Sequence, residues 1–187
     1  MKSDIYESAV NHWAFKVMIL LGSSRSNGNT WLVASEIAAA LGCELVNLES
    51  CRISHYDYLH HNKDDDFAKL VEKIILAENL IFATPVYWYA MSAQMKTFFD
   101  RFTDLITIRK SLGRQLSGKR TFVVATGTEE NLPEGFESPF MLTSNYFNMH
   151  YGGTLYCEFE SDLLLPDDFK GEINSFLESV RNHNLRV

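Results

Sequence analysis

Polar residues and glycines fill the segment Gly22–Thr30, which follows a short apolar run and directly precedes a helical pattern. Its side chains offer hydroxyl, amide and guanidinium donors, among them Ser23, Ser26 and Arg25. Backbone N–H groups at a helix N-terminus point outward and carry partial positive charge, so they attract anions. Arginine adds a charge-assisted contact. The segment therefore favours a phosphate site, and an ordinary polar turn with a helix cap is the alternative.

The spacing of this segment excludes two familiar nucleotide-binding loops. A Walker loop requires G-x4-G-K-[ST], but five residues separate Gly22 from Gly28, and Asn29 stands where the lysine should be. The dinucleotide-binding pattern G-x-G-x-x-G is also missing from the segment. A monophosphate held by neutral donors and one arginine fits these residues better than ATP or NAD does.

A second unusual segment, Thr84–Met91, follows the apolar run Asn79–Ala83 and carries three aromatic residues in a row. Pro85 has no N–H for a sheet ladder, so it is expected to end the strand. A rigid aromatic loop at the end of a strand favours a flat, apolar ligand. Because Tyr and Trp are also enriched at protein interfaces, a contact between two subunits is the alternative.

The elements that position these loops alternate as in an α/β domain. Continuous apolar runs suit parallel strands that are covered on both faces; strands are expected at Phe15–Leu21, Cys43–Leu48, Asn79–Thr84, Thr121–Ala125 and Thr154–Phe159. Helical patterns occupy most of the intervening chain; they are expected at Asn29–Leu41, Asp65–Ala77, Ser92–Phe102, from the loop Asn131–Pro139 to about His150, and from Pro166 onward.

Right-handed crossovers leave few arrangements for five parallel strands. The commonest is the flavodoxin-like order 2-1-3-4-5, a three-layer sandwich whose ligand crevice lies between strands one and three. In that arrangement the polar loop and the aromatic loop are neighbours. A phosphate site beside a site for an aromatic ring system describes flavin mononucleotide (FMN).

Composition narrows the class of protein further. The chain has 187 residues, enough for one domain with its own core, and a net charge of −7 that argues against a nucleic-acid partner. No apolar run approaches the roughly 20 residues of a membrane span. The three cysteines, Cys43, Cys51 and Cys157, contain no CxxC pair and fit a reducing cytoplasm better than a disulfide framework.

The two loops together, Gly22–Thr30 and Thr84–Arg101 (TPVYWYAMSAQMKTFFDR), resemble the flavodoxin-like NAD(P)H-dependent FMN reductase and quinone reductase family. The order of the elements extends this resemblance from Phe15 to the C-terminus. It implies an enzyme that transfers hydride from NAD(P)H through FMN to a quinone, a flavin or a similar small aromatic acceptor. It also implies a homodimer and a flavodoxin-like FMN-binding domain at residues 15–187, preceded by an N-terminal extension at residues 1–14.

The same resemblance implies which residues bind the cofactor. The phosphate would be held by Ser23, Arg25, Ser26, Asn29 and Thr30. The isoalloxazine ring would be bracketed by Pro85, Val86, Tyr87 and Trp88, with Thr126 and Gly127 on its other side. Because FMN carries the chemistry, no catalytic side chain is named.

Other readings of the sequence have less support. His55, His60 and His61 precede Asp64–Asp66, which makes a metal site conceivable, but a solvated loop before a helix is favoured. Some relatives hold an iron–sulfur centre after the second strand; Cys51 alone cannot supply the four cysteine ligands that such a centre needs. A flavodoxin-type electron carrier and a redox-sensing interaction protein stay as alternatives to the enzyme.

Overall fold

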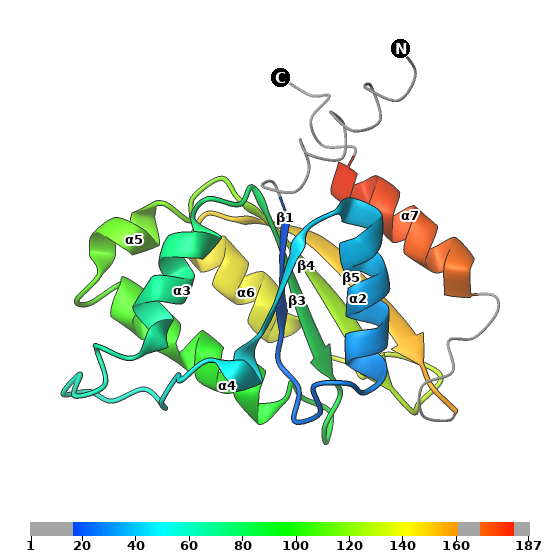
Figure 1. The fold of residues 1–187 in the computed structure, drawn as a ribbon, viewed down its shortest axis with the longest axis horizontal. Helices are drawn as coiled ribbons and strands as arrows, with labels where there is room; N and C mark the ends of the chain where they lie inside the picture. Colours follow the sequence, from blue (N-terminus) through cyan, green and yellow to red (C-terminus); the bar gives the residue numbers. More distant parts are fainter. Residues whose placement is uncertain (1–16, 161–168, 182–187) are drawn as a thin grey trace, which may run out of the picture.

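The computed structural model describes residues 17–160 and 169–181, which form a five-stranded parallel sheet between two layers of helices (Figure 1). The strand order is β2-β1-β3-β4-β5, which confirms the predicted flavodoxin-like order 2-1-3-4-5. The strands are β1 (Val17–Leu21), β2 (Glu44–Asn47), β3 (Asn79–Pro85), β4 (Arg120–Gly127) and β5 (His150–Glu158). Every residue of β1 and β3 is buried, as expected for central strands covered on both faces.

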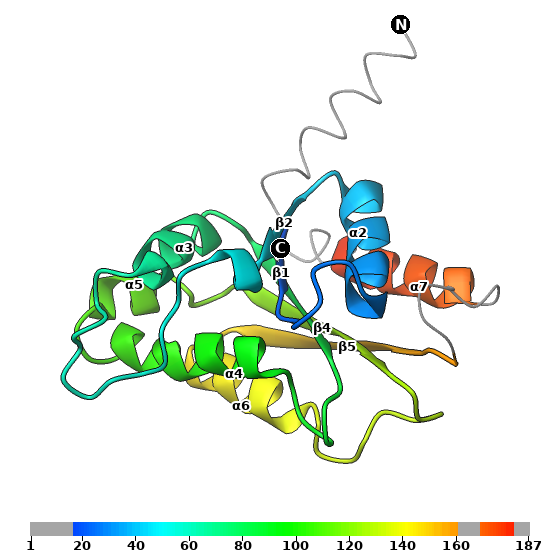
Figure 2. The same cartoon turned by 60° about the horizontal axis from the view of Figure 1, so that its bottom comes forward.

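Helices connect successive strands and cover the sheet. They are α2 (Asn29–Leu41), α3 (Asp66–Ile74), α4 (Ala93–Asp100), α5 (Lys110–Arg114), α6 (Ser138–Tyr146) and α7 (Phe169–Arg181), with 3-10 turns η1 (Leu48–Ser50) and η2 (Arg101–Leu105). Figure 2 shows α2 and α7 on one side of the sheet and α4 and α6 on the other. Within the described residues, no helix is both long and apolar enough to cross a membrane.

Two hydrophobic clusters lie on the two faces of the sheet. The cluster under α3, α4 and α6 is rich in phenylalanine, and Phe99 contacts both Phe82 on β3 and Phe140 on α6 with ring centroids 5.0 and 5.1 Å apart. The predicted apolar face of the helix after Ser92 is confirmed, because its members are buried: Met91, Met95, Phe98 and Phe102. The other cluster joins α2 and α7 to the sheet.

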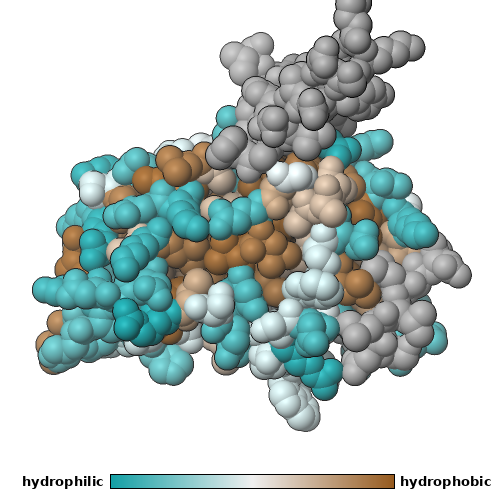
Figure 3. All heavy atoms as spheres, viewed as in Figure 1, coloured by the Kyte–Doolittle hydropathy of each residue, from teal (hydrophilic) through white to brown (hydrophobic). Residues whose placement is uncertain are grey.

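The edge strand β2 is only partly covered. Its residues Leu45 and Val46 are half-buried, unlike the fully buried residues of neighbouring β1. In Figure 3 the hydrophobic residues of this view gather over the middle, where this edge of the sheet lies between α2 and the α3–α4 side. The ligand-binding loops that the sequence predicts lie elsewhere, where β1, β3 and β4 end.

Several predicted boundaries differ from the structure. The last strand begins at His150 and not at Thr154, and α6 ends at Tyr146. Gly152 explains the first difference: a Cβ there would lie 2.3 Å from the Phe122 ring, so glycine lets the strand pass over this ring. Helix α5 was not predicted, and the expected helix start at Pro166 and the extension at residues 1–14 lie outside the described residues.

Candidate cofactor-binding site

A cavity of about 270 Å³ opens where the chain leaves β1, β3 and β4. Eleven residues line it: Ser23, Arg25, Gly28, Asn29, Thr30, Pro85, Val86, Tyr87, Thr126, Gly127 and Thr128. All predicted site residues except Ser26 and Trp88 are among them. The structure therefore brings the polar loop, the aromatic loop and the end of β4 to one place, as the strand order requires.

A smaller slot of about 190 Å³ adjoins this cavity and shares three of its lining residues, Val86, Gly127 and Thr128. The rest of its lining comes from the aromatic turn, the loop after β4 and strand β5, through Trp88, Tyr89, Glu129, Pro133 and Tyr156. Together the two spaces fall within the roughly 300–1,000 Å³ common for small-molecule sites. Trp88 thus belongs to the same site, at its other end.

The N-terminus of α2 opens into the cavity. Its N-cap residue, Gly28, has extended backbone and no side chain to bond the first turn, and that turn contains no acidic residue. Asn29 and Thr30, which begin the helix, line the cavity together with Arg25. Since the helix dipole and N–H groups favour negative charge, this end of the cavity can hold a phosphate.

The polar loop is held in place by the start of α4. Gly22 donates its N–H to the Ala83 carbonyl (2.8 Å), and the Ser92 hydroxyl donates to the Gly22 carbonyl (2.7 Å) while capping α4. A Cβ on Gly22 would lie 2.8 Å from the Met95 Cβ. Glycine is needed here because helix α4 packs directly on the loop backbone.

The aromatic segment, predicted as a rigid loop, contains a closed turn. Tyr87 and Ala90 exchange two backbone hydrogen bonds of 2.9 and 3.1 Å, which closes a two-residue turn. Trp88 and Tyr89 at its tip have φ of 48° and 65°, an unfavourable region for bulky side chains. Trp88 is 92% exposed and Tyr89 is 70% exposed. This turn projects at the lower edge of Figure 1.

Direct hydrogen bonds join the three parts of the site. The Ser24 hydroxyl lies 2.9 Å from the Tyr87 hydroxyl, which links the polar loop to the aromatic turn. The buried hydroxyls of Thr30 and Thr126 lie 2.6 Å apart, which links α2 to the end of β4. Ser26 points elsewhere and accepts a hydrogen bond from the Asn47 amide (2.9 Å) at the end of β2.

Several lining residues are missing from the predicted set. Gly28 and Tyr89 lie inside the two quoted motifs, and the cap position of Gly28 is a signal that could have identified it. The remaining residues come from the loop after β4 and from β5, where no local motif marks them: Thr128, Glu129, Pro133 and Tyr156. The pairing of β4 with β3 brings the loop after β4 to the site, and the pairing of β5 with β4 adds Tyr156.

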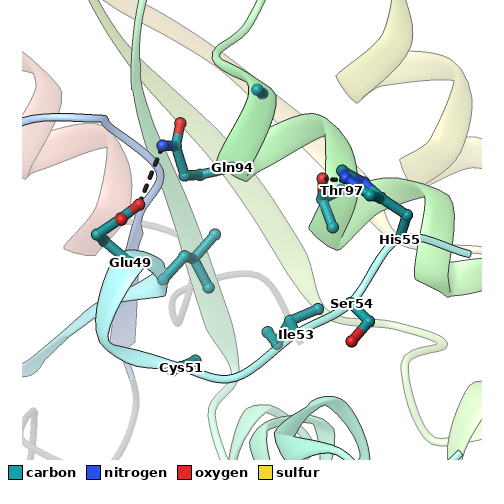
Figure 4. Close-up of a pocket in the computed structure, with 9 residues that line it drawn as sticks. Glu49, Cys51, Ile53, Ser54, His55, Gln94 and Thr97 are labelled. Atoms are coloured by element: carbon teal, nitrogen blue, oxygen red, sulfur yellow. Dashed lines mark hydrogen bonds between the residues drawn. The ribbon is translucent and has the colours of Figure 1, made fainter. Parts of the chain in front are cut away.

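A separate groove of about 430 Å³ lies between the segment after β2 and helix α4 (Figure 4). Hydrogen bonds cross it at both ends, from the Gln94 amide to the Glu49 carboxylate (3.0 Å) and between the His55 ring and the Thr97 hydroxyl (3.1 Å). Cys51 lines it, and burial, then the nearby Asp66, raises the pKa of its thiol. A protonated thiol is a poor nucleophile.

The histidines of this region have separate partners. The His60 ring bonds Asp104 at 3.0 Å, and the His61 ring bonds Asp57 at 2.7 Å. Among the described residues, no group of three or more His, Cys, Asp or Glu side chains is arranged to hold a metal ion. These side chains therefore act in local hydrogen bonds.

Comparison with known proteins identifies relatives of this chain. The Bacillus subtilis protein YwqN, which carries the name of an NAD(P)H-dependent FMN-containing oxidoreductase, is 31% identical over 120 residues, covering 60% of this chain and 66% of YwqN, slightly under two thirds. The iron–sulfur flavoprotein MJ1083 of Methanocaldococcus jannaschii is 28% identical, covering 92% of this chain and 95% of that protein. Our chain has three cysteines in all, too few for a cluster with four cysteine ligands.

Solved structures share the fold. The Trp repressor binding protein of Bacillus subtilis aligns with a TM-score of 0.67 and 24% identity, covering 90% of this chain and 98% of that one. An FMN-dependent NADH-azoreductase of Bacillus anthracis, solved with FMN, aligns with a TM-score of 0.65 and 10% identity over 89% of this chain and 98% of that one. At these identities the likeness concerns the fold alone.

A family model supplies the identification that the structural likeness cannot. It matches residues 15–151, which contain both loops and four of the five strands in full. The family is described as NADPH-dependent FMN reductase, which agrees with the resemblance seen in the sequence. The chain therefore belongs to this family of oxidoreductases, in which FMN is the cofactor and NAD(P)H the co-substrate.

Proposed function

We propose that this protein is an FMN-dependent NAD(P)H oxidoreductase that passes reducing equivalents to a quinone, a flavin or a similar small aromatic acceptor. The observation that carries the proposal is the single site at the ends of β1, β3 and β4. One end of that site is an open helix N-terminus, and the other end is a wall of exposed aromatic residues.

The phosphate of FMN would bind at the N-terminus of α2. Ser23, Asn29 and Thr30 line this end of the cavity and carry hydroxyl and amide groups, and the Arg25 guanidinium supplies positive charge. Ser26 is the weakest member of this group, because it does not line the cavity and its hydroxyl accepts a hydrogen bond from Asn47. The phosphate would thus be held by neutral donors and one cation.

The isoalloxazine ring would occupy the space between the aromatic turn and the end of β4. Pro85, Val86 and Tyr87 would contact the ring from β3 and the aromatic turn, Trp88 would extend this surface into the slot, and Thr126 and Gly127 would contact the ring from the end of β4. When bound, FMN supplies the hydride chemistry. The residues around it bind and orient the ring, and none of them is required to act as an acid or base.

The nicotinamide of NAD(P)H and the acceptor would use the same place beside the flavin ring, one after the other. Trp88 and Tyr89 offer exposed aromatic surface beside the slot, which suits a flat acceptor but does not select one aromatic compound over another.

The same exposed surface supports a homodimer, since aromatic residues are enriched at interfaces. The free cysteines support a reducing, cytoplasmic location, and we assign residues 15–187 to the FMN-binding domain.

An anaerobic mixing experiment tests the proposed function. The purified protein is loaded with FMN and mixed with NADH or NADPH while the flavin absorbance near 450 nm is followed. We expect rapid bleaching with at least one nucleotide, and recovery of the absorbance when a quinone is added.

Two other outcomes contradict this proposal. A flavin that stays oxidised with both nucleotides but accepts single electrons from a chemical reductant indicates an electron carrier. Failure to retain FMN contradicts both the oxidoreductase and the electron carrier. Light scattering of the same sample reports whether the protein is a dimer.

A further inference from the structure

Tyr156 on β5 reaches across to the loop after β4. Its hydroxyl donates a hydrogen bond of 2.6 Å to the backbone carbonyl of Glu129, and its side chain lines the slot. Burial, followed by the neighbouring Glu158 carboxylate, raises the pKa of Tyr156. The hydroxyl therefore keeps its proton and remains a donor at neutral pH.

Gly127 and Tyr156 are matched in size. A Cβ on Gly127 would lie 2.6 Å from the Tyr156 hydroxyl oxygen, and 3.3 Å from the nearest ring carbon. The Gly127 carbonyl is itself fixed, because it accepts a hydrogen bond from Phe159 N–H at 2.8 Å. The absence of a side chain at position 127 is what lets the tyrosine reach the loop.

The loop that Tyr156 holds has unused donors. Thr128 and Glu129 follow the last ladder position of β4, and within the described residues no protein group accepts a hydrogen bond from their backbone N–H groups. Both residues line the slot. Donors that are held rigidly beside a ligand stabilise negative charge better than donors that must first reorient.

We infer that Tyr156 is a positioning residue for the flavin, which it serves by anchoring the Glu129 carbonyl so that the loop Thr128–Glu129 presents its N–H donors to the slot. The inference rests on the proposed function. Reduction increases the negative charge on the flavin ring, so donors fixed in this way would favour the reduced form over the oxidised form. Tyr156 would then raise the reduction potential of bound FMN without touching the phosphate end.

The test compares Tyr156→Phe with Tyr151→Phe. Tyr151 is a suitable control because it is also half-buried on β5, but its hydroxyl bonds Glu137 and Thr154, away from the slot. For Tyr156→Phe we expect oxidised FMN to bind about threefold more weakly and reduced FMN about thirtyfold more weakly, consistent with one lost hydrogen bond and mobile donors. The tenfold difference corresponds to a two-electron potential lower by about 30 mV.

A second variant tests the same contact sterically. Gly127→Ala should displace the Tyr156 hydroxyl and lower the potential in the wild-type background. In the Tyr156→Phe background the hydroxyl is gone, so the added methyl should change the potential much less. This non-additivity is expected for residues in direct contact.

The outcomes separate the inference from the proposed function. If the wild-type protein does not bind FMN, both fail. If it binds FMN and Tyr156→Phe has the potential of the wild type or of Tyr151→Phe, only the role of Tyr156 is overturned. An additive effect of Gly127→Ala in both backgrounds overturns it as well. Thermal unfolding of each FMN-free variant shows whether a folding defect accounts for a change.

Discussion

Helices α2 and α3 follow neighbouring strands of the sheet, but their N-termini are completed differently. At α2 the cap residue Gly28 offers no side chain, and the first turn carries no acidic residue. At α3 the cap residue Asp65 accepts a hydrogen bond from Phe67 N–H (3.1 Å), and Asp66 lies in the first turn. The first helix end is open to an external anion, whereas the second is satisfied by the chain's own carboxylates.

The loop before α3 also neutralises its charges internally. Arg101 is 1% exposed, and its guanidinium bonds the Asp65 carboxylate, the Asp104 carboxylate (2.9 Å) and the Ser54 carbonyl (3.1 Å). His60 adds its contact to Asp104 from the other side. Buried charges of this kind require partners, and Asp65 and Asp104 provide them for Arg101.

The comparison shows that polar composition alone does not identify a binding loop. Both loops are rich in hydroxyl, amide and charged residues. They differ in where those groups point: the loop before α3 bonds Arg101 and its own backbone, whereas the loop before α2 lines a cavity. The difference predicts that mutations in the loop before α3 will affect stability and that mutations in the loop before α2 will affect ligand binding.

The largest effect is expected at Arg101, the residue of η2 that bonds the loop before α3. Arg101→Met would leave Asp65 and Asp104 buried without their cation, which costs about 3–5 kcal/mol of unfolding free energy. Urea denaturation followed by circular dichroism measures this loss. Arg114→Met is the control, because Arg114 is exposed and its loss should cost at most about 0.5 kcal/mol. Equal stability of the two variants would contradict a structural role for Arg101.

A smaller, opposite pattern is expected at the loop before α2. Arg25→Ala should weaken FMN binding about 10- to 100-fold, because a hydrogen bond to a charged group contributes about 1.5–3 kcal/mol. The unfolding free energy of the FMN-free protein should stay within about 0.5 kcal/mol of wild type, since Arg25 is exposed. Fluorescence titration measures the affinity.

Riboflavin provides the matched control for this prediction, since it has the same ring and lacks the phosphate. The affinity for riboflavin should be the same in wild type and Arg25→Ala. If both ligands lose affinity equally, Arg25 acts on the ring or on the fold, and the phosphate assignment is wrong.

A substitution can also give α2 the kind of N-terminus that α3 has. Gly28→Asp places a carboxylate at the cap position, where the extended backbone accepts any residue and the new Cβ would lie 3.3 Å from the Arg25 Cβ. Cap carboxylates stabilise helices by a few tenths of a kcal/mol relative to glycine. The FMN-free protein should therefore unfold at a slightly higher temperature, while FMN binds roughly tenfold more weakly because two anions compete for one helix end.

Gly28→Ala separates the two contributions, since alanine adds the Cβ without the charge. It should retain more FMN affinity than Gly28→Asp. The reverse order would mean that space, and not charge, limits the ligand at this helix end.

The fold could be predicted from the sequence because its signals are local. The continuous apolar runs of β1 and β3 mark central strands, and handedness leaves few orders for five of them. The short helix α5 escaped because five residues carry too little periodicity. The early start of β5 escaped because glycine is unusual inside a strand, whereas in the structure Gly152 makes room for Phe122.

The candidate site likewise contains residues that could be predicted from the sequence and residues that could not. Residues inside the two motifs, such as Arg25 and Tyr87, could be identified from composition and position, and the structure brings them together; their roles in binding stay predictions. Tyr156 could not be identified, because it reaches the site only through the pairing of β4 with β5, and no local motif marks Thr128 after β4. The closed turn at Trp88 and Tyr89 was missed because bulky residues rarely adopt positive φ.

The smallest expected effect is the pH dependence of the loop before α3. Burial alone would raise the pKa of Asp65, but hydrogen bonds from Arg101, Ser54 N–H and Phe67 N–H outweigh it, so the pKa is lowered. The folded state therefore binds this proton less readily than the unfolded state does. The stabilisation is complete above the unfolded pKa of about 4 and is lost as the pH falls through the lower folded value.

Asp65→Asn should remove this part of the pH dependence while keeping an oxygen at the cap position. Urea unfolding between pH 6 and pH 3 should show a shallower loss of stability for Asp65→Asn than for the wild type. Asp64→Asn is the control, because Asp64 is exposed, and its slope should match the wild type. If Asp65→Asn keeps the wild-type slope, the charge on Asp65 does not stabilise the fold, and the two helix ends differ in geometry alone.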